Sequence, residues 1–241
     1  MRKIFVANWK MHMTRGEARA YSETLARLLD GAVSPGRLVL APPFTALGAA
    51  WDPEGRWSLA GQNVAAEREG AFTGEVSAAM LAEAECRYAI VGHSERRRIF
   101  GEGEDLLAKK LARVREAGLT PIYCVGETAQ ERAAGRTPDI LERQAATLGE
   151  DPPGAPLVLA YEPVWAIGSG TAATPKDAGE ARALLSRLFS WRKDITILYG
   201  GSVTPGNAQE FLAAAGMDGL LVGGASLKPN SFAAIAGVRS V

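Results

Sequence analysis

Residues 157–170 read LVLAYEPVWAIGSG, a short apolar run followed by a carboxylate and a glycine-ended loop. A continuous apolar run such as 157–161 is typical of a strand that is buried on both faces in a parallel sheet. Glu162 follows the run, and Pro163 then leads into an apolar loop that ends at Gly168. This arrangement suits a general base under a movable flap. A salt-bridged surface glutamate is the alternative, although an exposed loop rarely carries so many large apolar side chains.

Similar apolar runs recur along the chain and alternate with segments of helical spacing. Eight runs in 241 residues give about 30 residues per repeat, the size of one βαβ step. This alternation predicts an α/β fold with a parallel sheet, and eight repeats favour a closed (β/α)8 barrel over an open doubly wound sheet. Because no linker divides the chain, we predict one (β/α)8 domain over residues 1–241. The predicted strands are 4–7, 38–41, 58–61, 88–91, 121–125, 157–161, 195–199 and 219–222.

Three of the intervening segments carry clear helix signals. Residues 17–29 and 105–117 place apolar side chains on one face. Thr174 and Pro175 predict the start of a helix over 178–189, as an N-cap followed by a first-turn proline. The predicted apolar face of 105–117 consists of Leu106, Leu107, Leu111 and Val114.

The composition is that of an ordinary globular protein without net charge. The 27 basic residues balance 27 acidic ones, which gives no general attraction to nucleic acid or to an anionic membrane. No apolar run reaches the roughly 18–20 residues of a membrane span, and residues 1–10 do not resemble a signal peptide. Cys86 and Cys124 lie far apart and form no redox or metal motif. We interpret them as reduced core thiols, which favours a cytoplasmic location.

Polar residues or glycines follow seven of the eight predicted strands. In a parallel barrel these strand ends converge on one face, where barrel active sites lie. The sequence therefore predicts one site built from distant segments. Its candidate residues are Asn8, Lys10, Gln62, Asn63, His93, Glu95, Glu127, Glu162, Gly200, Gly201, Ser202, Gly223 and Gly224.

The last two strand ends offer backbone groups for anion binding. The segments 200–203 (GGSV) and 223–226 (GGAS) let backbone N–H groups approach a ligand closely, and barrels commonly bind phosphate at this place. A single Gly-Gly more often marks a tight turn, but two pairs at the two expected strand ends favour a phosphate site. Gly168 in the flap could add a third donor.

Lys10 and His93 are candidates for stabilising charge. Lys10 could balance a phosphate or an oxyanion, but a Schiff-base nucleophile, as in a lysine aldolase, and a surface charge are alternatives. His93 lies at a strand-to-helix transition, where we expect Ser94 to cap the helix and the imidazole to stay neutral and donate a hydrogen bond. A core histidine satisfied by the backbone is the alternative. His12 has no such setting, and the two histidines and two cysteines do not form a zinc ligand set.

Together these parts favour one reaction class. A carboxylate base, a neutral hydrogen-bond donor, a cation and a phosphate cradle fit proton abstraction next to the carbonyl of a small phosphorylated substrate. The sequence carries no metal, nicotinamide or pyridoxal signature. It therefore predicts a cofactor-free isomerase.

The chain resembles the triosephosphate isomerase family in segments that follow the family's order from end to end. This resemblance implies a (β/α)8 TIM barrel that interconverts dihydroxyacetone phosphate and D-glyceraldehyde 3-phosphate in glycolysis and gluconeogenesis. A catalytically silent relative is the alternative, but Glu162, His93 and Lys10 are all present. The matching segments are 8–11 (NWKM), 61–64 (GQNV), 70–75 (GAFTGE), 91–97 (VGHSERR), 124–127 (CVGE), 160–168 (AYEPVWAIG), 199–203 (YGGSV) and 221–227 (LVGGASL).

The resemblance also implies a role for each residue. Glu162 looks like the base that moves the proton, and His93 looks like the neutral electrophile. Lys10 looks like the cation that steadies the enediolate, with Asn8 beside it. Glu95 would pair with Lys10, which argues against a Schiff-base lysine. The amides of the phosphate grip would come from Gly168, Ser202, Gly223 and Gly224.

The resemblance further implies a homodimer. The family is typically dimeric, and residues 65–77 resemble its interdigitating arm. Phe72 and Thr73 at the tip would enter a pocket beside the partner's Lys10. An apolar tip on a long polar loop independently favours a buried role for this tip.

Three features depart from the usual family pattern. The flap has Ser169 and Thr171 where the family more often has threonine and lysine. The resemblance therefore does not extend to the rate at which the flap closes. His12 replaces a frequent asparagine, and the chain is slightly shorter than the roughly 250 residues of typical barrels.

Overall fold

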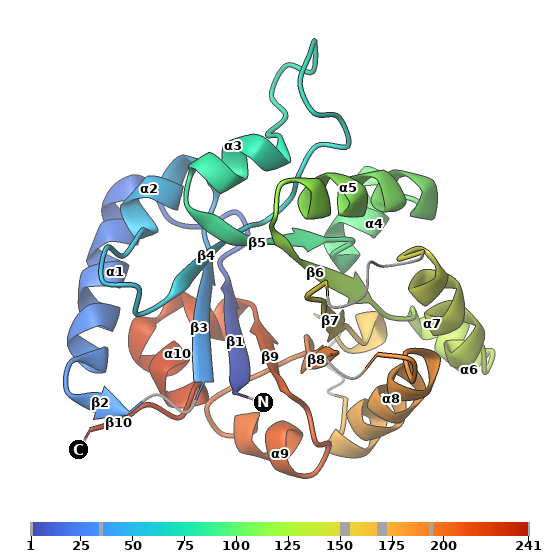
Figure 1. Cartoon of the computed structure of the whole chain (residues 1–241). Coiled ribbons are helices and arrows are strands. Elements are labelled where there is room, and N and C mark those ends of the chain that lie inside the picture. Colours follow the sequence, from blue (N-terminus) through green and yellow to red (C-terminus); the bar gives the residue numbers. More distant parts are fainter. Residues whose placement is uncertain (1, 34–35, 150–154, 168–172, 193–194, 241) are drawn as a thin grey trace.

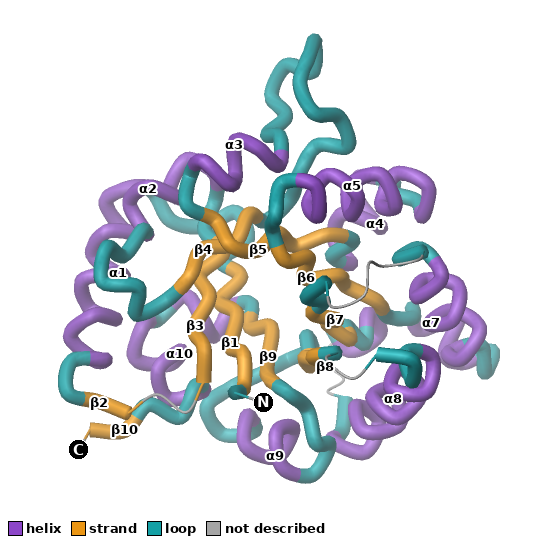
Figure 2. The backbone as a smooth tube through the Cα atoms, in the orientation of Figure 1, coloured by secondary structure: helices purple, strands orange, loops and turns teal. Residues whose placement is uncertain are grey.

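Eight parallel strands form a closed barrel at the centre of the computed structural model, which describes residues 2–33, 36–149, 155–167, 173–192 and 195–240 (Figure 1). Each predicted strand is present, so the predicted barrel is confirmed. Around the barrel, helices lie between consecutive strands (Figure 2). The barrel strands are β1 (Lys3–Asn8), β3 (Gly36–Ala41), β4 (Ser58–Gly61), β5 (Cys86–Val91), β6 (Thr120–Val125), β7 (Val158–Tyr161), β8 (Thr196–Tyr199) and β9 (Gly219–Val222).

The barrel closes where β1 pairs with β3 on one side and with β9 on the other. Ile4 stands opposite Gly219 in the pairing with β9. A side chain at position 219 would overlap the backbone of Ile4, so only glycine fits this contact. Outside the barrel, β2 (Ala32–Val33) pairs antiparallel with β10 (Arg239–Ser240).

Side chains of the barrel strands alternate between two apolar layers, as the period of two in a strand requires. The inner layer takes side chains from every barrel strand, and Cys124 is among them. The outer layer packs the other strand residues, such as Phe5, against helix residues such as Tyr21 and Leu25. The strands are therefore buried on both faces, as their continuous apolar runs predict.

Two of the long helices begin after threonine N-caps, of which Thr174 is the predicted one. Thr14 and Thr174 each accept a hydrogen bond from the third residue of the helix that follows, and an acidic side chain at that residue completes a capping box. No helix in the described ranges is long and apolar enough to cross a membrane. The helices are α1 (Arg15–Leu29), α2 (Leu47–Ala50), α3 (Ala78–Glu83), α4 (Ser94–Phe100), α5 (Glu104–Glu116), α6 (Ala129–Ala133), α7 (Thr137–Ala146), α8 (Pro175–Leu188), α9 (Ala208–Ala213) and α10 (Pro229–Ile235), with 3-10 turns η1 (Phe44–Ala46), η2 (Val164–Ala166) and η3 (Gly224–Leu227).

The predicted apolar face of α5 is wrong at one position. Leu106 is 38% exposed, whereas the Lys110 side chain is only 4% exposed. Lys110 can be buried because its Nζ lies 2.5 Å from a carboxylate oxygen of Glu102 and 2.7 Å from the side-chain oxygen of Asn63. Lys110, and not Leu106, therefore lies on the inner face of α5.

The segment between β4 and α3 projects away from the barrel (Figure 1). Phe72 and Thr73 lie exposed at its tip. The loop is held by its own backbone, since the N–H of Ala65 donates to the carbonyl of Val76 at 2.8 Å and that of Glu75 to the carbonyl of Phe72 at 3.0 Å.

Candidate active site

A cavity of about 290 Å³ lies at the carboxyl ends of the barrel strands. It brings together the side chains of Asn8, Lys10, His93 and Glu162 from the ends of three strands, β1, β5 and β7. Its opposite wall is the glycine-rich backbone that follows β8 and β9. That wall consists of Gly200, Gly201, Ser202, Val203, Thr204, Gly223, Gly224 and Ala225. Gly168, Ser169 and Thr171 lie outside the described residues.

Lys10 adopts a left-handed backbone conformation, with φ of 53°, just after β1. Such a conformation costs a residue with a side chain roughly 1–2 kcal/mol, so neighbouring contacts must hold it. The side-chain oxygen of Asn8 accepts a hydrogen bond from the Lys10 N–H at 3.0 Å, and Gln62 donates to the Lys10 carbonyl at 2.9 Å. The sequence placed Gln62 at a strand end without a role. In the structure it fixes the backbone of the lysine.

The ammonium of Lys10 forms an ion pair with Glu95, which lies in the first turn of α4. Its Nζ donates to the carboxylate at 2.6 Å. Although partial burial opposes the shift, the hydrogen bond and charge of Lys10 lower the pKa of Glu95. The carboxylate of Glu95 is therefore charged at neutral pH, and the ion pair holds the lysine at the edge of the cavity.

His93 is the N-cap residue of α4, and the expectation that Ser94 would cap this helix is wrong. The Nδ1 atom of His93 accepts a hydrogen bond from the Glu95 N–H at 3.2 Å, so Nδ1 carries a lone pair. The carboxylate of Glu95 is 3.7 Å from Nδ1, too far for a hydrogen bond. The imidazole proton therefore resides on Nε2, which lies 3.0 Å from a carboxylate oxygen of Glu162.

Glu162 is almost fully buried at the end of β7. One carboxylate oxygen lies 3.0 Å from Nε2 of His93, and the other accepts a hydrogen bond from the backbone N–H of Ser94 at 2.8 Å. Glycines make room for it, because a methyl at Gly200 would lie 2.9 Å from its Cγ and one at Gly126 would overlap its carbonyl oxygen. Sequence reasoning missed these contacts, because Ser94 and Gly126 contribute only backbone atoms to them.

The backbone after β9 meets the cation from β1. A methyl group on Gly223 would lie 3.3 Å from Cε of Lys10, which places this turn directly beside the lysine. Ser226 fixes the turn, because its hydroxyl donates to the Gly223 carbonyl at 2.7 Å. Ser202 is held from the other side by a hydrogen bond of 3.3 Å to the carbonyl of Ala166. The glycine-rich backbone and the ammonium of Lys10 thus line the same cavity, an arrangement that suits an anion.

Similarity to known proteins agrees with this geometry. The family model described as triosephosphate isomerase matches residues 3–239. The chain is 46% identical over 244 residues to a triosephosphate isomerase of Aquifex aeolicus, and 46% identical over 245 residues to one of Thermus thermophilus, with 98% of both chains covered in each case. It is 44% identical over 249 residues to one of Nitratidesulfovibrio vulgaris, with 98% of this chain and 99% of the relative covered.

The chain belongs to the triosephosphate isomerase family. Some strand-end residues of the family segments nevertheless lie outside the cavity. Asn63 binds the buried Lys110, and Glu127 is fully buried behind β7, where it accepts hydrogen bonds from Tyr161 and Trp165. These residues hold the framework of the family's site and do not line it.

Both cysteines of this triosephosphate isomerase family member are buried free thiols. Burial raises the pKa of Cys86 to about 12 and raises that of Cys124 well above its ordinary value. The thiolate forms of both residues are therefore disfavoured, which agrees with their interpretation as reduced thiols in the core. Within the described part of the chain, no cluster of three histidine, cysteine or acidic residues could hold a metal ion.

Proposed function

We propose that this chain interconverts dihydroxyacetone phosphate and D-glyceraldehyde 3-phosphate without a cofactor. The observation that carries the proposal is that Glu162, His93, Lys10 and the glycine-rich turns line one and the same cavity. The chain that forms this cavity belongs to the triosephosphate isomerase family. A space of about 290 Å³ suits a small phosphorylated substrate. Ser202, Gly223 and Gly224 would hold the phosphate.

The reaction moves one proton between neighbouring carbons. Glu162 takes the proton from the carbon next to the carbonyl, and the electron pair of that C–H bond flows to the carbonyl oxygen. The resulting enediolate is stabilised by the ammonium of Lys10 and by the N–H of His93. His93 handles the proton that one substrate oxygen loses and the other gains. Glu162 then returns its proton to the former carbonyl carbon. This acid–base arrangement is a standard case in enzymology.

Two contacts in the structure support these roles. Nε2 of His93 lies 3.0 Å from a carboxylate oxygen of Glu162, so the proposed donor and the proposed base already lie close together. A substrate carbonyl that enters between them would accept a hydrogen bond from Nε2. The carboxylate would then leave the Ser94 N–H, where it accepts at 2.8 Å, and approach the substrate carbon.

The alternative of a lysine aldolase is less well supported. A Schiff-base lysine must react as a free amine, whereas an ion pair stabilises the charged ammonium. Lys10 has such a partner in Glu95 at 2.6 Å. The simplest mark of a catalytically silent relative would be the loss of one of the three reactive side chains, and this chain has them all.

We further propose a cytoplasmic homodimer. A second cavity of about 210 Å³ lies beside the active site and is lined by Lys10, Met11, Phe44, Glu95 and Phe100, among others. Met11 and Phe100 are largely exposed in the single chain. The loop tip at Phe72 and Thr73 offers an apolar side chain for the equivalent cavity of a second copy. Sedimentation of the wild type and of Phe72→Asp tests this proposal, with a monomeric variant expected.

Turnover of D-glyceraldehyde 3-phosphate by the purified protein tests the isomerase proposal. We expect turnover by the wild type and a loss of about three orders of magnitude or more in Glu162→Gln, because the amide cannot accept the proton. Glu210→Gln, at an exposed site on α9, is the matched control and should keep full activity. Activity that survives Glu162→Gln would remove Glu162 as the base. Absence of turnover in the folded wild type would reject the proposed function.

A further inference from the structure

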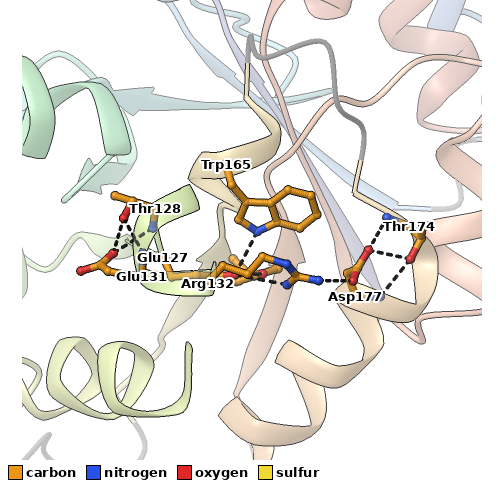
Figure 3. A network of polar contacts seen from close by, with 8 residues as sticks. Glu127, Thr128, Glu131, Arg132, Trp165, Thr174 and Asp177 are labelled. Carbon is orange, nitrogen blue, oxygen red and sulfur yellow. Dashed lines mark hydrogen bonds and ion pairs between the residues drawn. The ribbon is translucent and has the colours of Figure 1, made fainter. Parts of the chain in front are cut away.

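Arg132 contacts both described segments that flank residues 168–172 (Figure 3). Its Nη2 donates to Asp177 in the first turn of α8 at 2.5 Å. Its guanidinium carbon lies 4.2 Å from the centre of the Trp165 ring in η2. One side chain from α6 thus joins the end of one segment to the start of the other.

The contact with Asp177 reaches the first residues of α8. One carboxylate oxygen of Asp177 binds Arg132, and the other accepts from the N–H and the hydroxyl of Thr174 at 2.8 and 2.6 Å. Although burial opposes the shift, the hydrogen bonds from Thr174 and Arg132 lower the pKa of Asp177. The charged carboxylate therefore serves the helix cap and the arginine together.

A second nitrogen of the Arg132 guanidinium lies near Glu127, which follows β6 and contacts residues on both sides of the proposed base. Its Nη1 lies 3.5 Å from Glu127, whose carboxylate is fully buried. Glu127 in turn accepts from the Tyr161 hydroxyl at 3.1 Å and from the Trp165 indole N–H at 2.9 Å. Tyr161 precedes Glu162 directly, and Trp165 follows it by three residues. The buried carboxylate thus binds side chains on both sides of Glu162, and Arg132 supplies positive charge beside it.

We propose that Arg132 is a positioning residue for the isomerase reaction. Its guanidinium fixes η2 against the start of α8 and, through Glu127, fixes the segment 161–165 that presents Glu162. A planar guanidinium can stack on an indole and bind two carboxylates at once, whereas a lysine is a single point charge. Because a small displacement of a catalytic base slows proton transfer, the loss of Arg132 should lower kcat more than it changes KM.

This inference rests on the proposed isomerase function, so the wild type is assayed alongside the variants. Arg132→Ala removes all three contacts, and Arg132→Lys keeps only a charge. Asp177→Asn keeps an oxygen for Thr174 and weakens the bridge to α8. The matched control is Arg182→Ala, because Arg182 is also about one-third exposed and also pairs with an aspartate, Asp218, at 3.6 Å, away from the cavity.

We expect kcat of Arg132→Ala to fall about ten- to a hundredfold, with KM within about threefold of the wild type. Ethylguanidinium in the buffer should restore much of this loss, and Arg182→Ala should show neither loss nor rescue. Arg132→Lys and Asp177→Asn should show intermediate losses in kcat, and they decide the question if Arg132→Ala does not fold.

Three results would overturn the positioning role, and the first two concern kcat in the absence of ethylguanidinium. The first is a kcat of Arg132→Ala equal to that of Arg182→Ala, and the second is full kcat in Arg132→Lys. The third is a loss in Arg132→Ala that ethylguanidinium does not reverse. An inactive wild type would instead refute the isomerase function, and with it the role of Arg132.

Discussion

Two short lysine–glutamate pairs in this barrel differ mainly in their access to water. The Lys10–Glu95 pair spans 2.6 Å, with 30% and 37% of the two side chains exposed. The Lys110–Glu102 pair spans 2.5 Å, with only 4% and 3% exposed. Lys10 of the first pair lines the cavity, whereas neither member of the second pair does. Nearly equal distances therefore accompany different roles, because an exposed pair can exchange partners with a ligand and a buried pair cannot.

The buried pair belongs to a larger group of polar contacts. Glu102 also accepts from Arg96 at 2.6 Å, and Lys110 also donates to Asn63 at 2.7 Å. Burial lowers the pKa of Lys110, and the charge of Glu102 opposes that shift. The charges of Lys110 and Glu102 thus depend on each other.

The largest effect should follow from breaking the buried pair. Glu102→Gln leaves the ammonium of Lys110 buried without its counter-charge, so we expect a loss of about 3–5 kcal/mol in the free energy of unfolding. Denaturant unfolding measures this loss. Glu54→Gln, which removes the carboxylate of an exposed pair with Arg56, should change stability by about 0.5 kcal/mol or less. Similar losses in the two variants would contradict the distinction between buried and exposed pairs.

A smaller effect, on activity and not on folding, should follow from Lys10→Met. The variant removes the cation that faces the developing oxyanion, so we expect kcat/KM to fall about a hundred- to a thousandfold, or about 3–4 kcal/mol in barrier height. Its unfolding midpoint should stay close to that of the wild type. A variant that loses stability but keeps its activity would assign Lys10 a structural role.

The smallest effect concerns the pH dependence of the exposed pair. Lys10 lowers the pKa of Glu95 in the folded state, so the pair contributes stability that is fully present above the unfolded-state pKa of about 4.3. This contribution is lost as the pH falls through the lowered folded-state pKa. We expect Glu95→Gln to be less stable than the wild type by roughly 0.2–1 kcal/mol at pH 7. Thermal melting from pH 7 to pH 3 should show the difference vanish, and a constant difference would disprove the linkage.

The barrel and the strand-end residues were predictable because they depend on local patterns. Each strand is a short apolar run buried on both faces, and the polar or glycine residues follow it directly in the sequence. Glu162 and His93 could be proposed as partners because parallel strands end on one face of a barrel.

The remaining contacts depend on atoms that a sequence pattern does not describe. The backbone N–H of Ser94 holds Glu162, and any residue type carries that group. Lys110 occupies an inner position of α5 because Glu102 and Asn63 meet it there, which apolar periodicity cannot foresee. Arg132 joins segments whose proximity exists only after folding.

The pairing of β1 with β9 has a consequence for the order in which a ribosome makes this protein. Glu162 and His93 emerge well before residues 219–222, yet the barrel cannot close until those residues reach Ile4. The turn at Gly223 that packs beside Lys10 is made later still. A nascent chain that already contains the proposed base and electrophile therefore lacks the anion-binding wall. Contacts of such long sequence separation form slowly, so the growing chain must keep β1 unpaired on one edge while most of the protein is synthesised.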